Sequence, residues 1–397
     1  MKLFILLPRI PYPLEKGDKL RAYHQIRQLA KHHEVVLCAL NADGKVDEQK
    51  AFQALQPYCV SITFLKLSKL RILFGLADAF MRGLPLQCGY FYNRSAARKV
   101  DELIRKHQPD MLFGQLLRSA EYIRHKDLPK AIDYQDVFSY GMKRRADIAS
   151  FVTRPVFNME YRRLKRYEAA IFDDFDVKTI ISGPDRELIP HPKKDEILVV
   201  PNGVDHDYFK PQQQEKRYDI VFTGNMSYPP NVNAVDYLAN EILPKVWKVI
   251  PEAKLYIAGA SPDPKVRKAA SDRIIVSGWL DDIRDAYAQS RVFIAPMRIG
   301  TGLQNKLLEA MSMGLPAITS PLANASLGAK PGEEILIGSN AEEMAQHIIT
   351  LLTDQDKAAQ IAQAGFDFTN RVYDWEKATG KMEEAMLAVL SKQAKND

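Results

Sequence analysis

The sequence has only three cysteines among its 397 residues, and no two of them form a CxxC pair. Cys38, Cys59 and Cys88 are odd in number and widely spaced, which favours neither a disulfide framework nor a zinc site. The eight histidines likewise lack the HExxH spacing or a comparable metal-binding pattern. These absences predict a protein of a reducing compartment, the cytoplasm, that holds no metal.

Long apolar runs are also missing. The chain contains no stretch of about 18 consecutive apolar residues, so a membrane-spanning helix is not expected. The apolar run between Met1 and Pro8 is too short for a signal peptide and is predicted to form a buried strand. The Gly-x-Ser-x-Gly motif is absent too, which leaves a serine hydrolase without support.

The excess of positive charge is small. The chain has 55 Lys and Arg residues against 49 Asp and Glu residues, a net charge of +6. This balance suits a surface that contacts anionic lipid or binds phosphorylated ligands. It falls short of the charge of a dedicated nucleic-acid-binding protein, so a nucleic-acid partner is not expected.

The chain is long enough for two domains at about 150 residues each. Short apolar runs alternate with helical stretches, a pattern typical of a parallel sheet covered by helices on both faces. A stretch rich in Pro, Gly and polar residues separates two such series. We therefore predict a Rossmann-like domain at 1–200, a linker at 201–216, a second Rossmann-like domain at 217–370 and a C-terminal helix at 371–397 that packs back on the first domain.

The segment from Arg291 to Ser320 carries the clearest chemical signal. It is predicted to form a strand, a loop that contains Gly300 and Gly302, a helix at 303–313 and a further strand. Thr301 is well placed to be the N-cap of that helix. A glycine-bearing loop that leads into a helix offers free N–H groups and the positive end of the helix dipole, which together predict an anion site.

Three charged residues sharpen this prediction. Lys306 lies in the first helical turn, where a cation opposes the helix dipole unless an anion sits there. Arg298 adds a second cation from the same loop, and a diphosphate between the two would explain both. Glu309 lies one turn deeper on the same face, where a carboxylate can accept hydrogen bonds from the hydroxyls of a ribose. The alternative is a surface Lys–Glu pair without function, and the loop–helix context favours the ligand site.

The run from Arg298 to Pro316 resembles the donor motif of glycosyltransferase family 4, and it is most similar to the sugar transferases of bacterial exopolysaccharide and PEP-CTERM clusters. Further segments fit the same family over nearly the whole chain: 8–13, 16–19, 202–205, 222–226, 230–231, 278–279 and 373–376. The resemblance implies the GT-B fold, in which two Rossmann-like domains face each other across a cleft. It also implies retaining transfer of a sugar from a nucleotide diphosphate donor.

The resemblance assigns roles to individual residues. Gly17 and Gly224 would let the backbone approach the diphosphate, Arg298 and Lys306 would neutralise it as it leaves, and Glu309 would hold the ribose. The remaining donor-binding positions are Asn225, the base contacts Trp279 and Leu280, and the loop positions Gly300, Thr301, Gly302, Leu303 and Gln304. No cofactor and no metal are implied, because the sugar nucleotide is a co-substrate. The acceptor would be a glycan or a lipid-linked glycan.

Two positions depart from the family pattern. Thr301 stands where many members have the first Glu of Glu-x7-Glu, which contacts the donor sugar. Asn225, Met226 and Pro230 follow Gly224 where many members have an Arg and a Lys for the diphosphate. The identity of the donor therefore stays open. Two alternatives stay open as well: a nucleotide-sugar epimerase on the same fold, and an inactive scaffold that no longer binds a donor.

Polar residues follow two predicted strands of the first half. Gln115 and Arg118 follow one strand, and Asp133, Gln135 and Asp136 end or follow the next. Ligands of open α/β sheets bind beyond the carboxyl ends of the strands, so Gln115, Arg118 and Asp136 are predicted to lie on the acceptor side. The alternative for such residues is the capping of loops.

Two isolated sequence features, the pattern of Asp174 and Asp176 and the residue His24, are predicted to have structural rather than functional roles. Asp174 and Asp176 match the DxD metal pattern of the other major glycosyltransferase fold, but the pattern is common by chance and a structural role is predicted. His24, on the helix after Gly17, is predicted to be solvated or to cap a loop rather than to face a cleft.

The stretch from Lys66 to Arg94 mixes Lys and Arg with large apolar residues. A helix here would be basic and amphipathic, which suits contact with an anionic membrane surface. The alternative is that its apolar face packs on the domain. Acceptors in the families that this chain resembles are often lipid-linked, so peripheral attachment to the inner face of the cell membrane is predicted. The apolar contacts would be Leu70, Ile72, Leu73, Phe74 and Phe80.

Overall fold

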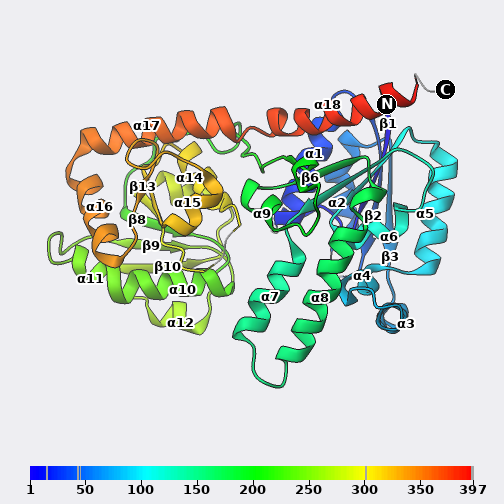
Figure 1. The fold of residues 1–397 in the computed structure, drawn as a ribbon. Helices are drawn as coiled ribbons and strands as arrows, with labels where there is room; N and C mark the ends of the chain where they lie inside the picture. The colour runs from blue at the N-terminus through cyan, green and yellow to red at the C-terminus, as the bar shows by residue number, and fades with distance from the viewer. Residues whose placement is uncertain (15–16, 43, 45, 300–301, 395–397) are drawn as a thin grey trace. The chain divides into compact units, whose positions relative to one another are not determined.

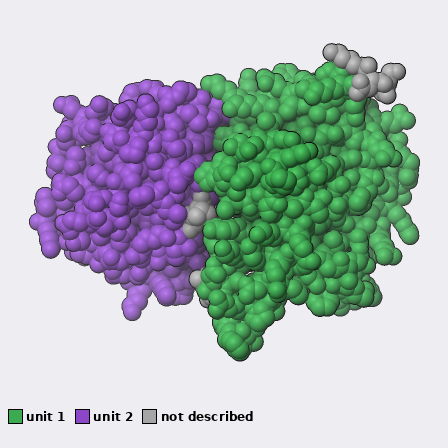
Figure 2. Space-filling model, viewed as in Figure 1, with its two compact units in different colours: residues 1–201, 375–397 green, residues 202–374 purple. Residues whose placement is uncertain are grey.

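The computed structural model describes residues 1–14, 17–42, 44, 46–299 and 302–394. The chain divides into two compact units, which Figure 2 shows in different colours. Unit 1 consists of Met1–Pro201 together with Trp375–Asp397, and unit 2 consists of Asn202–Asp374. Each unit is a Rossmann-like α/β domain built on one parallel sheet (Figure 1).

The sheet of unit 1 has seven parallel strands in the order β3-β2-β1-β4-β5-β6-β7. Their bounds are β1 Lys2–Leu7, β2 Glu34–Asn41, β3 Ser61–Lys66, β4 Met111–Gln115, β5 Lys130–Gln135, β6 Val177–Ile180 and β7 Leu198–Val199. Strand β1 is a continuous apolar run because both faces of the sheet are covered. Its residues Leu3, Ile5 and Leu7 enter one core cluster, and Phe4 and Leu6 enter another.

The helices of unit 1 cover both faces of its sheet (Figure 1). Their bounds are α1 Gly17–Leu29, α2 Glu48–Leu55, α3 Lys69–Met81, α4 Leu86–Phe91, α5 Arg94–His107, α6 Leu117–Ile123, α7 Phe138–Ile148, α8 Arg154–Ala170, α9 Gly183–Leu188 and α18 Trp375–Gln393, with short 3₁₀ turns at Gln56–Tyr58, Phe172–Asp174 and Lys194–Glu196. Helices α7 and α8 pack against each other as a hairpin that extends away from the sheet (Figure 1). Sequence reasoning did not predict this hairpin.

Unit 2 has six parallel strands in the order β10-β9-β8-β11-β12-β13. The strands are β8 Tyr218–Thr223, β9 Leu255–Ala258, β10 Ile274–Gly278, β11 Ser290–Ala295, β12 Ala317–Thr319 and β13 Leu336–Ile337. The helices are α10 Pro229–Tyr237, the π-helix η4 Leu238–Ile242, α11 Leu243–Val246, α12 Pro264–Lys268, α13 Arg284–Ala288, α14 Asn305–Ser312, α15 Pro321–Leu327, α16 Ala341–Thr353 and α17 Gln355–Val372. The π-helix η4 interrupts the α-helical run between α10 and α11.

The domain boundaries differ from the prediction in two places. The expected linker at 201–216 is not a separate segment, because residues from Asn202 onward belong to unit 2. Val204 pairs there with Asp374, so the first and last segments of unit 2 lie side by side. The chain returns to unit 1 at Trp375, and α18 packs on α1, with Met382 and Met386 inside the unit 1 core.

Both sheets reverse their strand order at one point, and this is where ligands bind in open α/β sheets. The reversal lies between β1 and β4 in unit 1 and between β8 and β11 in unit 2. None of the helices in the described ranges combines the length and apolar character needed to cross a bilayer.

Candidate active site

The predicted donor residues gather at the reversal point of unit 2. Gly224 follows directly after β8, and Arg298 follows β11. Helix α14 then begins at Asn305, so Lys306 lies in its first turn and Glu309 in its second. The expected N-cap, Thr301, lies outside the described residues together with Gly300. The N-cap of the observed helix is Gln304.

Lys306 is partly buried and held in one position. Its Nζ donates to Oδ1 of Asn231 at 2.6 Å and lies 4.4 Å from the centre of the Phe222 ring. Burial lowers the pKa of Lys306 to about 7, and the negative charge of Glu309 opposes that shift. Burial disfavours the charged form of the amine, so an incoming anion would regain the lost stabilisation.

Glu309 has a different partner. Its Oε2 accepts a hydrogen bond of 2.6 Å from the hydroxyl of Tyr287, which lies 2.8 Å from Oγ1 of Thr223. Burial raises the pKa of Glu309, while the Tyr287 hydroxyl and Lys306 act in the opposite direction. In the described part of the chain no ion pair within 4.0 Å joins Lys306 to Glu309. The alternative of a plain surface Lys–Glu pair is therefore wrong.

Two glycines allow the backbone to lie close to Lys306. Gly224 has φ +146°, and a Cβ on it would lie 2.7 Å from Nδ2 of Asn231 and 3.1 Å from Nζ of Lys306. Gly259 follows β9 with the same φ, and its Cβ would lie 1.8 Å from the carbonyl oxygen of Gly224. Both positions therefore require glycine. The backbone after β8 comes close to the amine only because side chains are missing there.

Arg298 lies in a different environment from the one predicted. Its Nη1 bonds Oε1 of Glu241 at 3.0 Å, its Nε lies 3.3 Å from Oδ1 of Asn233, and its guanidinium stacks on Tyr237 at 4.1 Å. These partners come from α10 and the π-helix η4. In this structure the guanidinium of Arg298 is paired with Glu241, and its convergence with Lys306 on the start of α14 stays a prediction.

The start of α14 keeps the free backbone groups that an anion needs. Gln304 makes no side-chain cap bond, and its Nε2 donates instead to the carbonyl of Gly302. A Cβ on Gly302 would meet open space, whereas Leu303 packs on the core of unit 2. The N–H of Leu307 donates to the carbonyl of Gln304, and no side chain of the described residues caps the N–H groups of Asn305 and Lys306.

The other predicted donor contacts have mixed positions. The side chain of Asn225 accepts bonds from Ser227, which closes a local turn. Trp279 is 63% exposed after edge strand β10, and Leu280 packs partly on the core. In unit 1, Gly17 begins α1, and a Cβ there would meet open space. Asn225 is thus a turn residue, and the roles of the other three stay predictions.

The acceptor-side residues lie at the carboxyl ends of β4 and β5. Gln115 is buried and donates to the carbonyl of Asp18 at 3.0 Å. Arg118 stacks between the rings of Phe91 and Phe138, and burial lowers its pKa to about 10. Asp136 is exposed and accepts a bond from the N–H of Val137 at 2.8 Å, so it caps its own loop.

Two residues at the same edge have strained backbones. Leu116 has φ +62° and Gln135 has φ +61°, a region that side chains rarely occupy. The buried Oε1 of Gln135 and the buried Nε of Arg118 have no hydrogen-bond partner. Asp133, by contrast, forms a fully buried ion pair with Arg21 and has a structural role. Strain and unpaired polar atoms make this edge a candidate for binding a polar ligand.

Asp174, Asp176 and His24, the isolated features of the sequence, make structural contacts. Asp174 pairs with Arg124 at 2.7 Å, and Asp176 accepts from the N–H of Lys130 at 2.8 Å, so the DxD pattern has structural partners. His24 is buried and stacked on Trp375 at 4.9 Å, so the prediction that it is solvated is wrong. Over the described ranges, no group of three or more His, Cys, Asp and Glu is placed to hold a metal ion.

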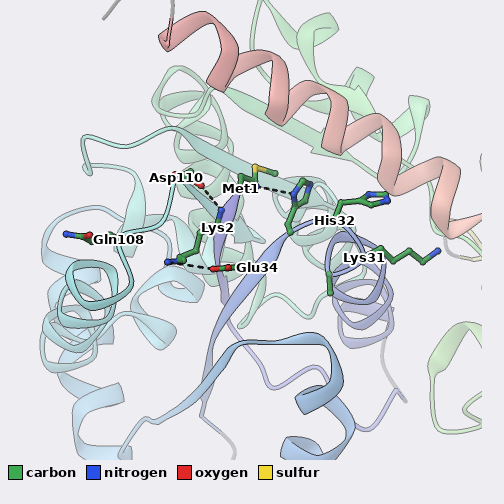
Figure 3. Close-up of a pocket in the computed structure, with 9 residues that line it drawn as sticks. Met1, Lys2, Lys31, His32, Glu34, Gln108 and Asp110 are labelled. Carbon is green, nitrogen blue, oxygen red and sulfur yellow. Dashed lines mark hydrogen bonds and ion pairs between the residues drawn. The ribbon is translucent and has the colours of Figure 1, made fainter.

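A broad hollow of about 600 Å³ opens elsewhere on unit 1 (Figure 3). Its lining comes from the amino ends of β1, β2 and β4, the opposite edge from the one where ligands bind. Its charged residues already have partners: Lys2 pairs with Glu34, Asp110 accepts from the backbone N–H of Lys2, and Lys31 pairs with Glu376 of α18. This hollow is not a candidate active site.

Comparison with known proteins assigns a family to the segment that carries these residues. Residues 217–354 match the family described as glycosyl transferases group 1, and the match includes β8, β11 and α14. This segment of unit 2 is a domain of the glycosyl transferases group 1 type. An uncharacterized 44.6 kDa protein from the cps region of Klebsiella pneumoniae is 24% identical, over 95% of this chain and 97% of that protein.

A curated enzyme matches over a shorter stretch. It is the UDP-Gal:alpha-D-GlcNAc-diphosphoundecaprenol alpha-1,3-galactosyltransferase of Escherichia coli, 29% identical over 34% of this chain and 38% of that enzyme. Among solved structures, the sucrose-phosphate synthase of Thermosynechococcus elongatus has a TM-score of 0.70 at 14% identity, covering 99% and 100% of the two chains. HepE from Anabaena with UDP and glucose has a TM-score of 0.67 at 14% identity, covering 97% and 99%. The fold is GT-B.

Sequence reasoning missed several residues of this site. Asn231 holds Lys306, Tyr287 holds Glu309, and Gly259 supports Gly224. None of these three lies in the run that carries the motif. The glycine after β9 offered the one available signal, because a glycine at the end of an inner strand suggests a close backbone approach.

Proposed function

We propose that this glycosyltransferase is a retaining, metal-independent hexosyltransferase that uses a nucleotide diphosphate-sugar. It transfers the sugar to a glycan or lipid-linked acceptor in polysaccharide biosynthesis. It uses no cofactor, because the sugar nucleotide is a co-substrate. We place it in the cytoplasm, at the inner face of the cell membrane.

The observation that carries this proposal is the environment of Lys306. The partly buried amine of Lys306 lies beside Gly224. Lys306 is in the first turn of a helix whose N-terminus has no side-chain cap. A group that carries negative charge on several oxygens suits this arrangement, and a diphosphate does so. Glu309, one turn deeper, is the group proposed to accept the ribose hydroxyls.

The proposed reaction breaks the bond between the anomeric carbon and a diphosphate oxygen and forms a bond to an acceptor oxygen. Lys306 and the N–H groups of α14 stabilise the negative charge that develops on the leaving diphosphate. The acceptor attacks from the face that the diphosphate leaves, and the acceptor proton passes to the departing phosphate oxygen. Configuration is thereby retained, and the protein supplies no nucleophile.

Two features support a lipid-linked acceptor. The matching Escherichia coli enzyme acts, by its name, on a diphosphoundecaprenol-linked sugar. Helix α3 leaves Leu70, Leu73 and Phe74 exposed at 72%, 64% and 73%. These three side chains do not pack on the domain, whereas Ile72 of the same helix packs on the unit 1 core, so the prediction of Ile72 as a membrane contact is wrong and the packing alternative holds for that face. Phe74, together with Met81, also lines an apolar hollow of about 440 Å³.

Binding and turnover of a donor test the proposal. Thermal melting with UDP, GDP, ADP and dTDP should show stabilisation of the native protein by at least one of them, and Lys306→Ala should lose it. Lys330→Ala is the matched control, because Lys330 is an exposed lysine of unit 2 with a surface partner, Glu333. NMR of the sugar released from the corresponding sugar nucleotide should show the anomeric configuration of the donor.

The remaining outcomes identify the rival functions. If none of the four nucleotides stabilises the protein, the inactive scaffold is the better description. Release of a sugar with an altered ring stereocentre, without an acceptor, would identify an epimerase instead.

A further inference from the structure

The turn between α7 and α8 exposes large apolar side chains at the end of a projection. Phe151 is 93% exposed and Val152 is 82% exposed, and Val156 in the first turn of α8 is 55% exposed. The two helices extend away from the sheet of unit 1 and place this turn at their far end (Figures 1 and 2). Three neighbouring apolar side chains at a projecting tip lose favourable burial unless something covers them.

The hairpin that carries this tip is strongly basic. Residues 138–170 contain eight Lys or Arg residues against three Asp or Glu residues. Two of the acidic residues are turned inward: Glu160 accepts from backbone N–H groups at the start of α4, and Glu168 accepts from the N–H of Ser139. Asp147 is the exposed acid of the hairpin. The exposed bases are Lys143, Arg145, Arg154, Arg162, Lys165 and Arg166. The outer surface of the hairpin is therefore almost entirely positive.

The hairpin also contacts helix α3, through Arg163. Arg163 of α8 donates to the carbonyls of Phe80 and Leu84, and its guanidinium lies 4.8 Å from the centre of the Phe80 ring. The first residue of α8, Arg154, lies nine residues before Arg163, or about 14 Å along the helix. The turn between α7 and α8 thus projects beyond the part of α8 that contacts the basic, apolar helix α3.

We propose that the tip formed by Phe151, Val152 and Val156 inserts into the surface of an anionic phospholipid bilayer, with the bases of the hairpin bound to the lipid phosphates. The inference rests on the peripheral attachment in the proposed function and assigns it a contact that the sequence did not indicate. Three side chains expose at most a few hundred Å², less than the roughly 800 Å² that each partner contributes to a stable protein interface. A bilayer needs no such area, because apolar tips and positive charge each add to membrane affinity.

The first experiment measures co-sedimentation of the full chain with vesicles of phosphatidylcholine and phosphatidylglycerol, at low salt. Phe151→Ser with Val152→Ser should weaken binding by about tenfold or more, because burial of a large apolar side chain contributes at least that factor. The matched control carries the same two changes elsewhere on unit 1, Phe52→Ser with Val60→Ser, at positions that are 43% and 62% exposed. The control should bind like the native protein.

A second measurement reports the depth of the tip. Phe151→Trp should shift its fluorescence to shorter wavelength when vesicles are added, and Phe52→Trp should not. Vesicles of phosphatidylcholine alone should bind more weakly, since each Lys or Arg near an anionic surface contributes about a fivefold gain in partition.

The outcomes separate this inference from the attachment on which it rests. If the native protein binds but the tip variant binds equally well, the tip is not inserted, and attachment through α3 stands. If the native protein ignores anionic vesicles, both fail, while donor binding is unaffected. A concentration-dependent dimer that the tip variant abolishes would show that a second copy covers the tip, and would overturn the proposal.

Discussion

At the scale of single residues, Lys306 combines a charge with partial burial. The pKa of its amine falls to about 7 from the model-compound value of 10.5 because burial disfavours the charged form. The amine is therefore largely neutral above pH 8 in the free protein. A bound diphosphate would restore the charge, since a nearby negative group raises the pKa again.

The first prediction is that diphosphate binding takes up a proton at this site. Between pH 7.5 and 9, the affinity for UDP or GDP, whichever binds, should fall as pH rises, by up to tenfold per pH unit. Below about pH 7 the amine is charged in both states and contributes no dependence. Titration calorimetry in buffers of different ionisation enthalpy should measure nearly one proton taken up at pH 8.5. Lys306→Arg, which stays charged, should bind without this uptake, and the same uptake in that variant would contradict the assignment.

The second prediction concerns Gly259. A Cβ there would lie 1.8 Å from a backbone oxygen at φ +146°, and backbone cannot move aside as a flexible side chain can. Gly259→Ala should therefore destabilise unit 2 by about 2–4 kcal/mol and weaken nucleotide binding, because it displaces Gly224. Gly302→Ala is the control, since its Cβ meets open space. Urea unfolding followed by the fluorescence of Trp247 and Trp279 measures the difference. Equal stability of the two variants would rule out this role for Gly259.

The third prediction concerns metal. Because Lys306 and backbone N–H groups are proposed to stabilise the leaving diphosphate, sugar transfer should survive excess EDTA. Asp174 and Asp176 already have protein partners, which leaves them poorly suited to coordinate an ion. Loss of transfer on chelation, restored by manganese or magnesium, would return both aspartates to consideration as ligands.

At the scale of elements, the π-helix η4 determines where Arg298 lies. The extra residue in the π turn interrupts the α-helical run between α10 and α11, and Glu241 of this turn bonds Arg298 in the loop after β11. Arg298 is exposed, so its ion pair with Glu241 contributes little, about 0–1 kcal/mol. A weak exposed pair can be exchanged for a diphosphate, which binds a guanidinium more strongly than a carboxylate does.

The fourth prediction tests that exchange with two variants. If Arg298 leaves Glu241 to bind the donor, Arg298→Ala should lower kcat/KM by about two to three orders of magnitude. Glu241→Gln should leave kcat/KM unchanged or raise it, because it frees the guanidinium. A purely structural ion pair would lower thermal stability equally in both variants and leave kcat/KM alone, and steady-state kinetics with melting curves separates the two outcomes.

At the scale of the whole molecule, the chain builds unit 1 from two segments that unit 2 separates in sequence. Helix α18 supplies Met382 and Met386 to the core beside α1, and Trp375 stacks on His24. The stability of unit 1 therefore depends on residues that follow all of unit 2. Since each unit has its own core, the two need not unfold in one transition.

The fifth prediction follows from this arrangement. Met382→Ala should destabilise unit 1 by about 2–5 kcal/mol, the usual cost of truncating a fully buried methionine, and leave unit 2 unaffected. Differential scanning calorimetry should show one transition moving to lower temperature and the other, stabilised by the bound nucleotide, staying in place. Equal shifts of both transitions would mean that the units unfold together.

The sequence alone determined the two parallel sheets, because fully buried strands require continuous apolar runs that helical stretches separate. It also determined the loop and helix that carry Lys306 and Glu309, since glycines, periodicity and charge lie there within one short run. It did not reveal Asn231, Tyr287, Gly259 or Glu241, which lie 22 to 75 residues from their partners.

Only the tertiary structure decided which side chains meet, because parallel strands bring distant carboxyl ends to one edge. It also paired Arg298 with Glu241, since a π turn that composition does not encode carries a carboxylate within reach of the guanidinium. It also left Phe151 and Val152 exposed. The sequence of two neighbouring apolar residues does not show whether they are buried or exposed. The packing of α7 on α8 places this pair in an exposed turn.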